Sequence, residues 1–387
     1  MIDQTLHLNE PGFLRIEFFM TAIRPIDDVI GLPIDELETP ALLLDRAALN
    51  QNLTTMADYF RDRSANLRPH FKNHKCTQLA RLQLEAGSAV GMTCAKLGEA
   101  EILAAAGIEN ILIANQVVGR SKMERLTQVA RRARLSLAVD HVDQIQAISE
   151  AAVRADVQIG VLVEVDIGMG RCGVAFGEPA LQLTRYVMDS PGIVFDGLQA
   201  FEGHLIYIQD ANERRERTIA AMHRAIKTRQ LIEAAGISVN VISGGSSSTY
   251  QFISDLPGVD EIQAGTYATM DCAYRKVSPE FQQALSVLTR VISRRSPGTA
   301  VLDVGVKGAG NEFGLPEIKG YPDLVIPFFK SEEHCVVNET PDWMIGQTVE
   351  LIPSHACTTC NLYRQFHVHE DGQIVDVWPI EASGMLT

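Results

Sequence analysis

The feature that most constrains the fold is an alternation of short apolar runs with helical patterns, which extends from residue 67 to residue 264. The apolar runs, each about the length of a strand, lie at 67–71, 89–94, 110–114, 135–140, 159–166, 194–200, 239–243 and 261–264. Eight strand–helix units in roughly 200 residues match the size of a (β/α)8 barrel, whose strands are buried on both faces and are therefore apolar throughout. An open doubly wound sheet has the same alternation but usually fewer strands, so the number of strands favours the barrel.

A different pattern follows the predicted barrel. After about residue 271 the strand candidates are alternating or β-branched runs separated by Gly, Pro and Asp, and helical patterns are scarce. The earlier apolar run 39–45 has no partner in the barrel series, so we assign it to the later strands. We therefore expect an α/β protein of 387 residues with a TIM (β/α)8 barrel over 46–272 and a second, mostly β domain formed by 1–45 and 273–387.

Composition and charge exclude several classes of partner. The formal net charge of −14 and the lack of a long basic run argue against a nucleic-acid or anionic-membrane surface. The apolar run 13–22 is interrupted by Arg15 and Glu17, and no stretch approaches the roughly 20 apolar residues of a membrane helix. Seven cysteines, an odd number spread over a long chain, predict free thiols or metal ligands. Since no signal peptide is evident either, we expect a cytoplasmic protein without a membrane partner.

Lys72 is the residue on which the functional interpretation depends. It ends the first strand of the series, and functional residues of barrels and open α/β sheets lie at the carboxyl ends of strands. A lone lysine is most often a solvated surface cation. A lysine at a barrel strand end beside a phosphate site instead indicates a Schiff base with pyridoxal phosphate. Burial and the cationic neighbours Arg68, His70 and Lys75 would lower the pKa of Lys72 and expose the free amine.

Two Gly-rich loops are candidates for that phosphate site. Residues 243–249 (Ser-Gly-Gly-Ser-Ser-Ser-Thr) follow the seventh strand, and residues 263–267 (Gln-Ala-Gly-Thr-Tyr) follow the eighth. These two loops form the usual phosphate site of a barrel, because Gly permits close approach of the backbone and N–H and hydroxyl groups surround the anion. They lack the Gly-Lys-Ser/Thr ending of a P-loop, and a flexible Gly/Ser turn is the alternative interpretation.

A third Gly-rich segment, 168–173, matches Gly-x-Gly-x-x-Gly, the pattern of a dinucleotide-binding turn. The match arises in the fifth strand–helix unit instead of the first, and no clear acidic residue ends a strand about 20 residues later. We therefore interpret the segment as a tight loop that presents Arg171 over the mouth of the barrel.

A candidate metal site lies in the mostly β part of the chain. His355 and Cys357 follow the apolar run 349–353 and are two residues apart, so on a strand both side chains would face the same side. Imidazole and thiolate are zinc ligands, and two protein ligands leave positions open for water or substrate, although three is the usual number. A buried histidine beside inert thiols is the alternative interpretation.

These motifs occur together, and in this order, in a known family. The matching segments are 68–72 (Arg-Pro-His-x-Lys), 163–174 (Val-Glu-Val-Asp-x-Gly-x-Gly-Arg-Cys-Gly-Val), 243–245 (Ser-Gly-Gly), 263–271 (Gln-Ala-Gly-x-Tyr-x-x-Met-Asp), 331–334 (Ser-Glu-Glu-His) and 353–357 (Pro-Ser-His-x-Cys). From about Thr39 to the C-terminus the chain resembles the D-threonine aldolase and D-serine dehydratase family, fold-type III pyridoxal phosphate enzymes related to alanine racemase by an N-terminal barrel. The resemblance implies a homodimer that binds a small D-amino acid.

Residue roles follow from the resemblance. It implies that Lys72 forms the Schiff base, that His70 lies beside the cofactor and that Arg171 faces the pyridine nitrogen. His355 and Cys357 fall on the family's divalent-metal pair, for Mn, Mg or Zn, which would lie in the β domain and bind the β-hydroxyl of the substrate. The positions that would hold the cofactor phosphate are Ser243, Gly244, Gly245, Gly265, Thr266 and Tyr267.

Two departures from the family pattern affect the expected reaction. The aldolases carry His-x-Asp at the metal, whereas the His-x-Cys of 355–357 is the dehydratase form, with a softer thiolate that favours zinc. After the sixth strand the aldolases place Tyr-His-Gly and a further His used in proton transfer. Here Tyr207 has that last position and His204 comes earlier, so we take both as candidate catalytic residues.

The resemblance as a whole is closer to the aldolases than to the dehydratases. We therefore expect a metal-assisted pyridoxal phosphate lyase that cleaves D-β-hydroxy-α-amino acids, of the D-threonine or D-3-hydroxyaspartate type, to glycine and an aldehyde. The first alternative is a dehydratase that converts D-serine or D-3-hydroxyaspartate to a keto acid and ammonia. The second is an amino-acid racemase, which needs a second acid/base on the opposite face of the cofactor and no metal.

Overall fold

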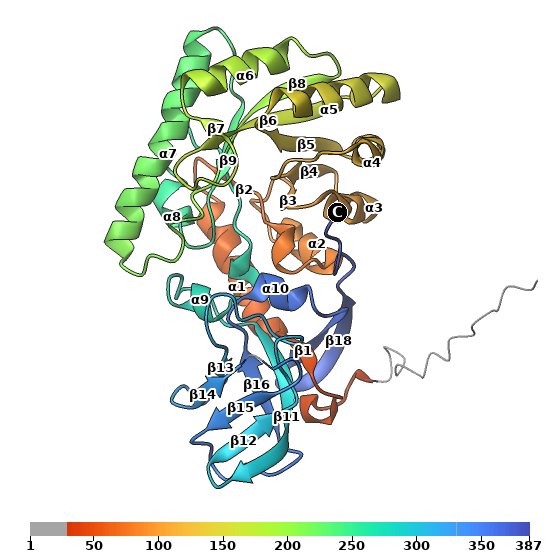
Figure 1. Cartoon of the computed structure of the whole chain (residues 1–387), viewed down its shortest axis with the longest axis vertical. Helices are drawn as coiled ribbons and strands as arrows, with labels where there is room; N and C mark the ends of the chain where they lie inside the picture. The colour runs from red at the N-terminus through yellow and green to blue at the C-terminus, as the bar shows by residue number, and fades with distance from the viewer. Residues whose placement is uncertain (1–28, 330) are drawn as a thin grey trace, which may run out of the picture.

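The structure is a computed structural model that describes residues 29–329 and 331–387. The apolar run 13–22 and the rest of residues 1–28 lie outside this description. Across the described residues, no helix combines the length and the apolar character that crossing a bilayer requires. Figure 1 shows two parts, a barrel of parallel strands in the upper half and a region of mostly antiparallel strands below it.

The barrel is built from the strands that the apolar runs predict. These are β2 (Asn66–Leu67), β3 (Met92–Cys94), β4 (Asn110–Ile113), β5 (Arg134–Val139), β6 (Ile159–Asp166), β8 (Ile193–Ala200), β9 (Val241–Gly244) and β10 (Glu261–Ile262). They pair in parallel in the order β2-β10-β9-β8-β6-β5-β4-β3, and the short β7 (Val174–Ala175) pairs with β6. Parallel bridges from Leu67 to Ala89 and from His70 to Thr93 join the two ends of this order, so the sheet closes and the predicted TIM barrel is confirmed.

The first strand is shorter than predicted. The run 67–71 contributes only Leu67 to a regular strand, and the chain turns into the 3-10 helix η3 (Phe71–Asn73) soon afterwards. Pro69 has no N–H to donate to a neighbouring strand, which limits the ladder at this point. Lys72 therefore lies in a turn of helix just beyond the strand end.

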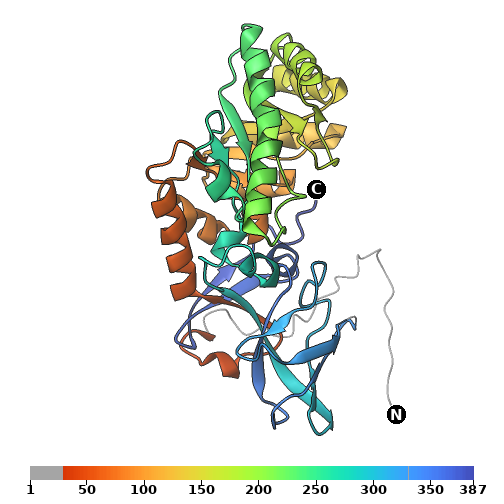
Figure 2. The ribbon, with the colours of Figure 1, turned by 90° about the vertical axis from the view of Figure 1, so that its left-hand side faces the viewer.

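Helices alternate with the strands and cover the outside of the barrel. They are α1 (Arg46–Phe60), α2 (Thr77–Glu85), α3 (Leu97–Ala105), α4 (Arg120–Ala130), α5 (Val142–Ala155), α6 (Glu178–Met188), α7 (Ala211–Ala234) and α8 (Tyr250–Ile253). The short α9 (Cys272–Arg275) follows the last barrel strand and lies next to the sheet region (Figure 1). In α5, Ile145, Ile148 and Ala152 recur at helical spacing and are buried, so this face packs on the sheet. Asp210 begins α7, the long green helix of Figure 2, because its side chain accepts a hydrogen bond from the backbone N–H of Glu213 at 2.8 Å.

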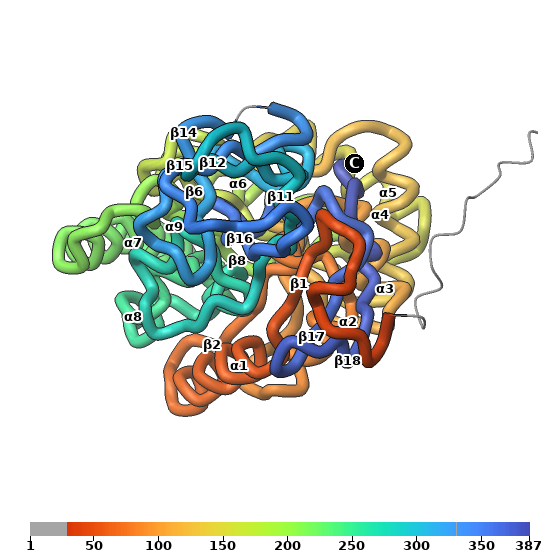
Figure 3. Tube along the Cα trace, turned by 90° about the horizontal axis from the view of Figure 1, so that it is seen from below, coloured from red at the N-terminus to blue at the C-terminus, as the bar shows by residue number. Residues whose placement is uncertain are grey.

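The second region is a sheet of mostly antiparallel strands. Its strands are β1 (Ala41–Asp45), β11 (Leu285–Ser296), β12 (Thr299–Leu302), β13 (Glu317–Ile318), β14 (Val325–Phe328), β15 (Cys335–Asn338), β16 (Thr348–Ile352), β17 (Gln365–Glu370) and β18 (Gln373–Pro379). The order is β14-β15-β12-β11-β1-β17-β18, with β16 pairing both β11 and β13. The early strand β1 lies between β11 and β17, although both of those strands come much later in the sequence (Figure 3).

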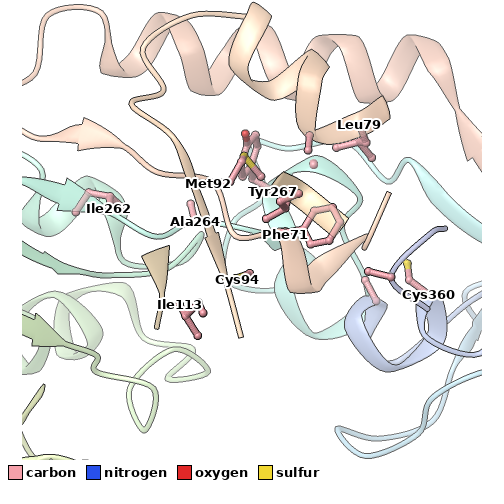
Figure 4. Packing of buried hydrophobic residues seen from close by; sticks show 14 of the residues in the cluster. Phe71, Leu79, Met92, Cys94, Ile113, Ile262, Ala264, Tyr267 and Cys360 are labelled. Atoms are coloured by element: carbon pink, nitrogen blue, oxygen red, sulfur yellow. The ribbon is translucent and has the colours of Figure 1, made fainter. Parts of the chain in front are cut away.

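The short helix α10 (Ala356–Cys360) connects this sheet region to the barrel. It follows β16 and packs against η3, where the side chain of Asn73 donates a hydrogen bond to the sulfur of Cys357 at 3.8 Å. Phe71 of η3 and Cys360 of α10 belong to one continuous cluster of buried apolar residues (Figure 4). Lys72 therefore lies where the barrel and the sheet region meet.

Candidate active site

A cavity of about 220 Å³ lies at the carboxyl ends of the barrel strands, next to α10. The predicted site residues that line it are His70, Lys72, Arg171, Gly245, Gly265, Thr266 and Cys357. The predicted residues that do not line it are Ser243, Gly244, Tyr267, His204, Tyr207 and His355. One cavity therefore brings together residues from loops after β2, β6, β9 and β10 and a residue of the sheet region.

Lys72 reaches this cavity from η3. Its backbone N–H donates to Nδ1 of His70 at 3.4 Å, and its Nζ lies 5.7 Å from the centre of the Phe201 ring. Burial lowers the pKa of the Lys72 ammonium, the negative charge of Cys357 opposes this shift, and Arg171 adds to it. A larger fraction of the amine is therefore neutral than in water, and the neutral amine is the nucleophilic form.

The positive charge that lowers the pKa of Lys72 does not come from the sequence neighbours Arg68 and Lys75. Arg68 binds Glu261 through two hydrogen bonds of 2.7 Å, and the Nζ of Lys75 lies 2.6 Å from a carboxylate oxygen of Glu99. Each cation is thus neutralised by its own buried carboxylate. The expectation that these two residues act on Lys72 is wrong, because Arg171, distant in sequence, is the cation that does so.

Arg171 is presented by the turn that the Gly-x-Gly-x-x-Gly segment forms. Gly168 and Gly170 have positive φ angles of 127° and 66°, and their backbone N–H groups donate to the Asp166 carboxylate at 2.9 and 3.1 Å. The Arg171 guanidinium lies 5.4 Å from the centre of the Phe201 ring. Phe201 therefore contacts both Lys72 and Arg171, and the glycines form an arginine-presenting loop as predicted.

The Gly/Ser loops form one wall of the cavity. Gly245, Ser246 and Ser247 line it after β9, and Gly265 and Thr266 line it after β10. A Cβ atom on Gly265 would lie 3.0 Å from the carbonyl oxygen of His70, so glycine allows this loop to approach the lysine-bearing segment closely.

Three residues predicted for the phosphate site do not line the cavity but lie next to residues that do. Ser243 accepts a hydrogen bond from the Gln263 side chain at 2.8 Å inside the barrel. A Cβ atom on Gly244 would lie only 1.8 Å from the Ala200 carbonyl oxygen, so this glycine permits the approach of neighbouring strands. The hydroxyl of Tyr267 is fully buried and accepts a hydrogen bond from Gln83 at 3.0 Å.

His355 and Cys357 lie together at the start of α10. Nδ1 of His355 lies 3.1 Å from Oδ2 of Asp271, which also accepts a hydrogen bond from the backbone N–H of Ala356 at 2.9 Å. Burial raises the pKa of the Cys357 thiol, but the positive charges of His355 and Lys72 outweigh burial and leave that pKa below its ordinary value. Burial lowers the pKa of His355, but the charges of Cys357 and Asp271 outweigh burial and raise that pKa to about 10. The pair is therefore a thiolate beside a charged histidine ring whose Nδ1 is held by a carboxylate.

This arrangement fits a divalent metal ion. Metal-binding histidines usually direct their second ring nitrogen to a carboxylate or carbonyl, as His355 does with Asp271, and a thiolate is a soft ligand that suits zinc. Within 29–329 and 331–387, no group of three or more His, Cys, Asp or Glu side chains is arranged to hold a metal. The chain itself thus offers two ligands here.

The two candidate catalytic residues of the loop after β8 lie in different places. His204 lies outside the cavity, in a surface depression with Arg217 and Arg224. Tyr207 packs edge-on against Tyr274, a cavity residue, with ring centres 5.6 Å apart. Burial, followed by the nearby carboxylate of Asp271, raises the pKa of Tyr207 above its ordinary value.

Several cavity residues were not singled out from the sequence. Ser246, Ser247 and Gln263 belong to the two predicted phosphate loops, and Cys172 belongs to the segment 168–173. The cavity residues outside any predicted site segment are Asn73, Ala95, Ala114, Asn115, Gln199, Phe201 and Tyr274. Asn115 and Phe201 directly follow predicted strands, so their position in the series could have identified them. Tyr274 comes from α9, beyond the last strand, and no local pattern marks it.

The fold and the site together define a class of protein. The barrel has a partly buried lysine just after its first strand, an arginine on the loop after β6 and Gly/Ser loops after the last two strands. This is the arrangement of a fold-type III pyridoxal phosphate enzyme.

Comparisons with known proteins identify the family. Residues 44–272 match the family described as "Alanine racemase, N-terminal domain", and residues 284–369 match the family described as "Putative serine dehydratase domain". The chain is 38% identical to the D-threonine aldolase of Arthrobacter sp, with 92% of this chain and 95% of the relative covered. It is 32% identical to the 3-hydroxy-D-aspartate aldolase of Paracoccus denitrificans (strain Pd 1222), with 92% and 94% covered.

The crystal structure of D-threonine aldolase from Filomicrobium marinum agrees. It superposes with a TM-score of 0.90 at 36% identity and covers 92% of this chain and 99% of that chain. The chain therefore belongs to the family of pyridoxal-phosphate-dependent lyases that contains these aldolases, with the barrel of alanine racemase, and the resemblance inferred from its motifs is confirmed.

Proposed function

We propose that this enzyme cleaves the Cα–Cβ bond of D-β-hydroxy-α-amino acids and releases glycine and an aldehyde. The observation that carries the proposal is the single cavity shared by Lys72, Arg171 and Cys357, which puts a nucleophilic amine and a metal-binding thiolate within reach of one small substrate. The names of the relatives, D-threonine aldolase and 3-hydroxy-D-aspartate aldolase, support the same reaction.

The cavity residues fit pyridoxal phosphate. Lys72 would attach the cofactor, Arg171 would lie at its ring nitrogen, and the backbone and hydroxyl groups of 245–247 and 265–266 would hold its phosphate. Ser243, Gly244 and Tyr267 would support these loops from behind, as their hydrogen bonds and close packing suggest. When bound, the cofactor supplies an electron sink for the electron pair left by the broken bond.

His70 and Arg171 would set the charge around the cofactor ring. Burial and the charge of Lys72 hold the pKa of His70 well below its ordinary value, so this imidazole stays neutral and its Nδ1 accepts the Lys72 N–H. Arg171 is always charged and can only donate hydrogen bonds. Arg171 would therefore leave the ring nitrogen of the cofactor without a proton, and the ring would attract electrons less strongly. A second group that activates the substrate is then more important.

His355 and Cys357 would provide that activation by holding a divalent metal ion, for which Mn, Mg and Zn are the candidates. When bound, such an ion polarises the β-hydroxyl of the substrate and lowers the pKa of that group. Asp271 holds the ring of His355 through Nδ1, and the same ring also makes a side-chain hydrogen bond with Cys357, so imidazole and thiolate are directed to one place.

Tyr207 is the better candidate of the two for handling protons. It borders the cavity through Tyr274, whereas His204 lies in the surface depression outside it. The raised pKa of Tyr207 keeps its hydroxyl protonated, so it would orient the substrate oxygen by hydrogen bonding and return a proton instead of acting as a base. In the overall reaction the β-hydroxyl loses its proton, the Cα–Cβ bond breaks and Cα takes up a proton.

A dehydratase is the second candidate, because the His355–Cys357 pair has the form that the dehydratases of the family carry. The two functions differ in products. Incubation of the holoenzyme with D-threonine, D-3-hydroxyaspartate and D-serine should give glycine with an aldehyde from the first two. Ammonia and a keto acid without glycine would establish the dehydratase instead, and interconversion of enantiomers that survives removal of metal would establish a racemase.

We further propose that the enzyme is a cytoplasmic homodimer whose two domains comprise 46–272 and 1–45 with 273–387. All seven cysteines are free, which suits a reducing compartment. Light scattering on the purified holoenzyme measures the oligomeric state, and a monomer at micromolar concentration would contradict this part of the proposal.

A further inference from the structure

Asn73 joins three parts of the chain at the cavity. It follows Lys72 in η3, lines the cavity and is 1% exposed. Its amide nitrogen donates a hydrogen bond to the sulfur of Cys357 in α10, with 3.8 Å between the two atoms. Its amide oxygen accepts a hydrogen bond of 2.8 Å from the hydroxyl of Thr269, which comes after the last barrel strand. Both polar atoms of the Asn73 side chain therefore have a partner.

The chemistry of these partners determines which way the Asn73 amide faces. A thiolate can only accept a hydrogen bond, so the amide must turn its NH₂ group to Cys357, and its oxygen then accepts the Thr269 hydroxyl. Thr269 is completely buried, and its carbonyl oxygen accepts the backbone N–H groups of Ala284 and Leu285 at 3.0 and 2.9 Å. Thr269 is thus a fixed donor that holds the amide in this orientation.

One short segment supports both members of the His355–Cys357 pair. Thr269 orients the amide that contacts Cys357, and Asp271, two residues later, holds the ring of His355 at 3.1 Å. Between them, Met270 has a φ angle of 58°, which is uncommon for a residue other than glycine. Such backbone outliers persist where the surrounding structure holds them, and they cluster at functional sites. The segment therefore directs one support to each side chain of the pair.

The sulfur of Cys357 also accepts a hydrogen bond from the ring of His355. A ring nitrogen that binds a metal ion has no proton to donate, so this hydrogen bond is lost when a metal ion occupies the pair. The hydrogen bond from Asn73 does not depend on His355 and is retained. Hydrogen bonds to a metal-bound sulfur stabilise its negative charge and orient it, and they tune the metal ion through this ligand.

We propose that Asn73 is a positioning residue of the metal pair: its amide, held by Thr269, fixes the sulfur of Cys357 and reduces the negative charge that this sulfur gives to the metal ion. The proposal rests on the metal site of the proposed function and deepens it. An ion that receives less charge from its thiolate ligand attracts the β-hydroxyl oxygen of the substrate more strongly. Asn73 thus supports the metal from the sulfur side, as Asp271 does from the histidine side.

The test uses Co²⁺, because charge-transfer absorption from a thiolate to Co²⁺ reports the state of the sulfur. The spectrum is the difference between the holoenzyme with Co²⁺ and the holoenzyme with Zn²⁺, so that the absorbance of pyridoxal phosphate cancels. Asn73→Ala removes the hydrogen bond, the sulfur holds its electrons less tightly, and the thiolate band should move to longer wavelength. The affinity for Zn²⁺, measured by equilibrium dialysis, should fall by about tenfold, as is typical when a group that supports a metal ligand is removed.

Thr269→Val tests the proposal without changing a residue that lines the cavity. Valine has the shape of threonine but no hydroxyl, so the Asn73 amide loses the donor that orients it. The Co²⁺ band should move in the same direction as in Asn73→Ala, by a smaller amount. Thr184→Val is the matched control, because Thr184 is equally buried and its hydroxyl donates to the Ala180 carbonyl in α6, also at 2.8 Å. This control should keep the wild-type band and affinity.

The results separate the role of Asn73 from the proposed function. A wild-type band position in both Asn73→Ala and Thr269→Val would overturn that role and leave the metal site in place. If Asn73→Ala does not fold, the comparison of Thr269→Val with Thr184→Val decides, and equal bands in these two variants overturn the proposal. Bound Co²⁺ without a thiolate band in the wild type would overturn the metal site and the proposal together. The spectra need no substrate, so ammonia in place of glycine would overturn the aldolase reaction alone.

Discussion

The carboxylate of Asp271 joins the barrel to the sheet region by holding the ring of His355, with 3.1 Å between Oδ2 and Nδ1. Asp271 follows the last barrel strand and its other oxygen accepts the backbone N–H of Tyr274, which starts α9. The same side chain therefore fixes both the proposed metal ligand and the helix that carries the cavity residue Tyr274.

Asp271→Asn should weaken metal binding without removing the metal ligands. The amide keeps an oxygen for the N–H of Tyr274, but it loses the charge that orients His355. Changes to such supporting carboxylates typically reduce metal affinity by about 10- to 100-fold. Equilibrium dialysis with Zn²⁺ or Mn²⁺ measures the affinity, and Asp342→Asn, at a fully exposed position paired with Arg294, is the control. Equal affinity in both variants would show that the charge of Asp271 does not support metal binding.

Lys72→Ala should abolish the covalent attachment of pyridoxal phosphate and reduce kcat by at least about 10³-fold, as removal of a nucleophile does. The absorbance band of the lysine-bound cofactor disappears in this variant, and mass spectrometry after borohydride treatment finds no cofactor-bearing peptide. Lys227→Ala, on the exposed side of α7, retains both signals. A wild-type protein that stays colourless with added pyridoxal phosphate would contradict the assignment of Lys72.

The barrel could be predicted from the sequence because each of its strands is a continuous apolar run. For β6 the predicted and observed limits are identical, Ile159–Asp166, since every residue except those at positions 160 and 166 is buried. The end of the first strand could not be predicted in the same way. Arg68 and Pro69 directly follow β2, but Pro69 has no backbone N–H to donate to a neighbouring strand. The chain then turns into η3 instead of continuing the strand.

Position along the strand series also identified Lys72 and Arg171, because side chains after parallel strands converge at one end of a barrel. It could not identify Tyr274, which reaches the cavity from α9, beyond that series. The position of Tyr274 depends on how the sheet region packs against the barrel, and sequence spacing contains no direct record of that packing. Sequence proximity was misleading for Lys75, whose charge is directed to Glu99 instead of Lys72.

Glu99→Gln should destabilise the protein strongly, because it leaves the ammonium of Lys75 buried without a counter-charge. The side chains of Lys75 and Glu99 are 7% and 1% exposed, and breaking such a buried pair costs about 3–5 kcal/mol. Glu101→Gln is the matched control. Its partner Arg125 lies at the same distance of 2.6 Å, but both side chains are 35% exposed, so about 1 kcal/mol or less is expected. Urea unfolding of both variants measures the difference, and similar losses would refute the role of burial.

His74 should make the stability of the fold depend on pH. Its Nδ1 accepts the backbone N–H of Cys76 at 3.2 Å, so the proton is on Nε2, which donates to Gln83 at 3.0 Å. Burial lowers the pKa of His74 from 6.5 to about 4, since the interior disfavours its charged form. Between these two values the unfolded chain binds more protons than the folded one. Stability is therefore complete above about pH 6.5 and falls as the pH decreases towards 4.

The loss attributable to His74 reaches about 3 kcal/mol near pH 4, because each pKa unit corresponds to about 1.4 kcal/mol. His74→Asn removes the titrating ring, while the amide oxygen can still accept the N–H of Cys76. This variant should be less stable than the wild type at pH 7.5, because the bond to Gln83 is lost, but its free energy of unfolding should decrease less between pH 7.5 and pH 4.5. Urea unfolding at both pH values measures this change. His223→Asn, an exposed position on α7, should retain the wild-type slope, and an unchanged slope in His74→Asn would show that the buried imidazole does not govern acid stability.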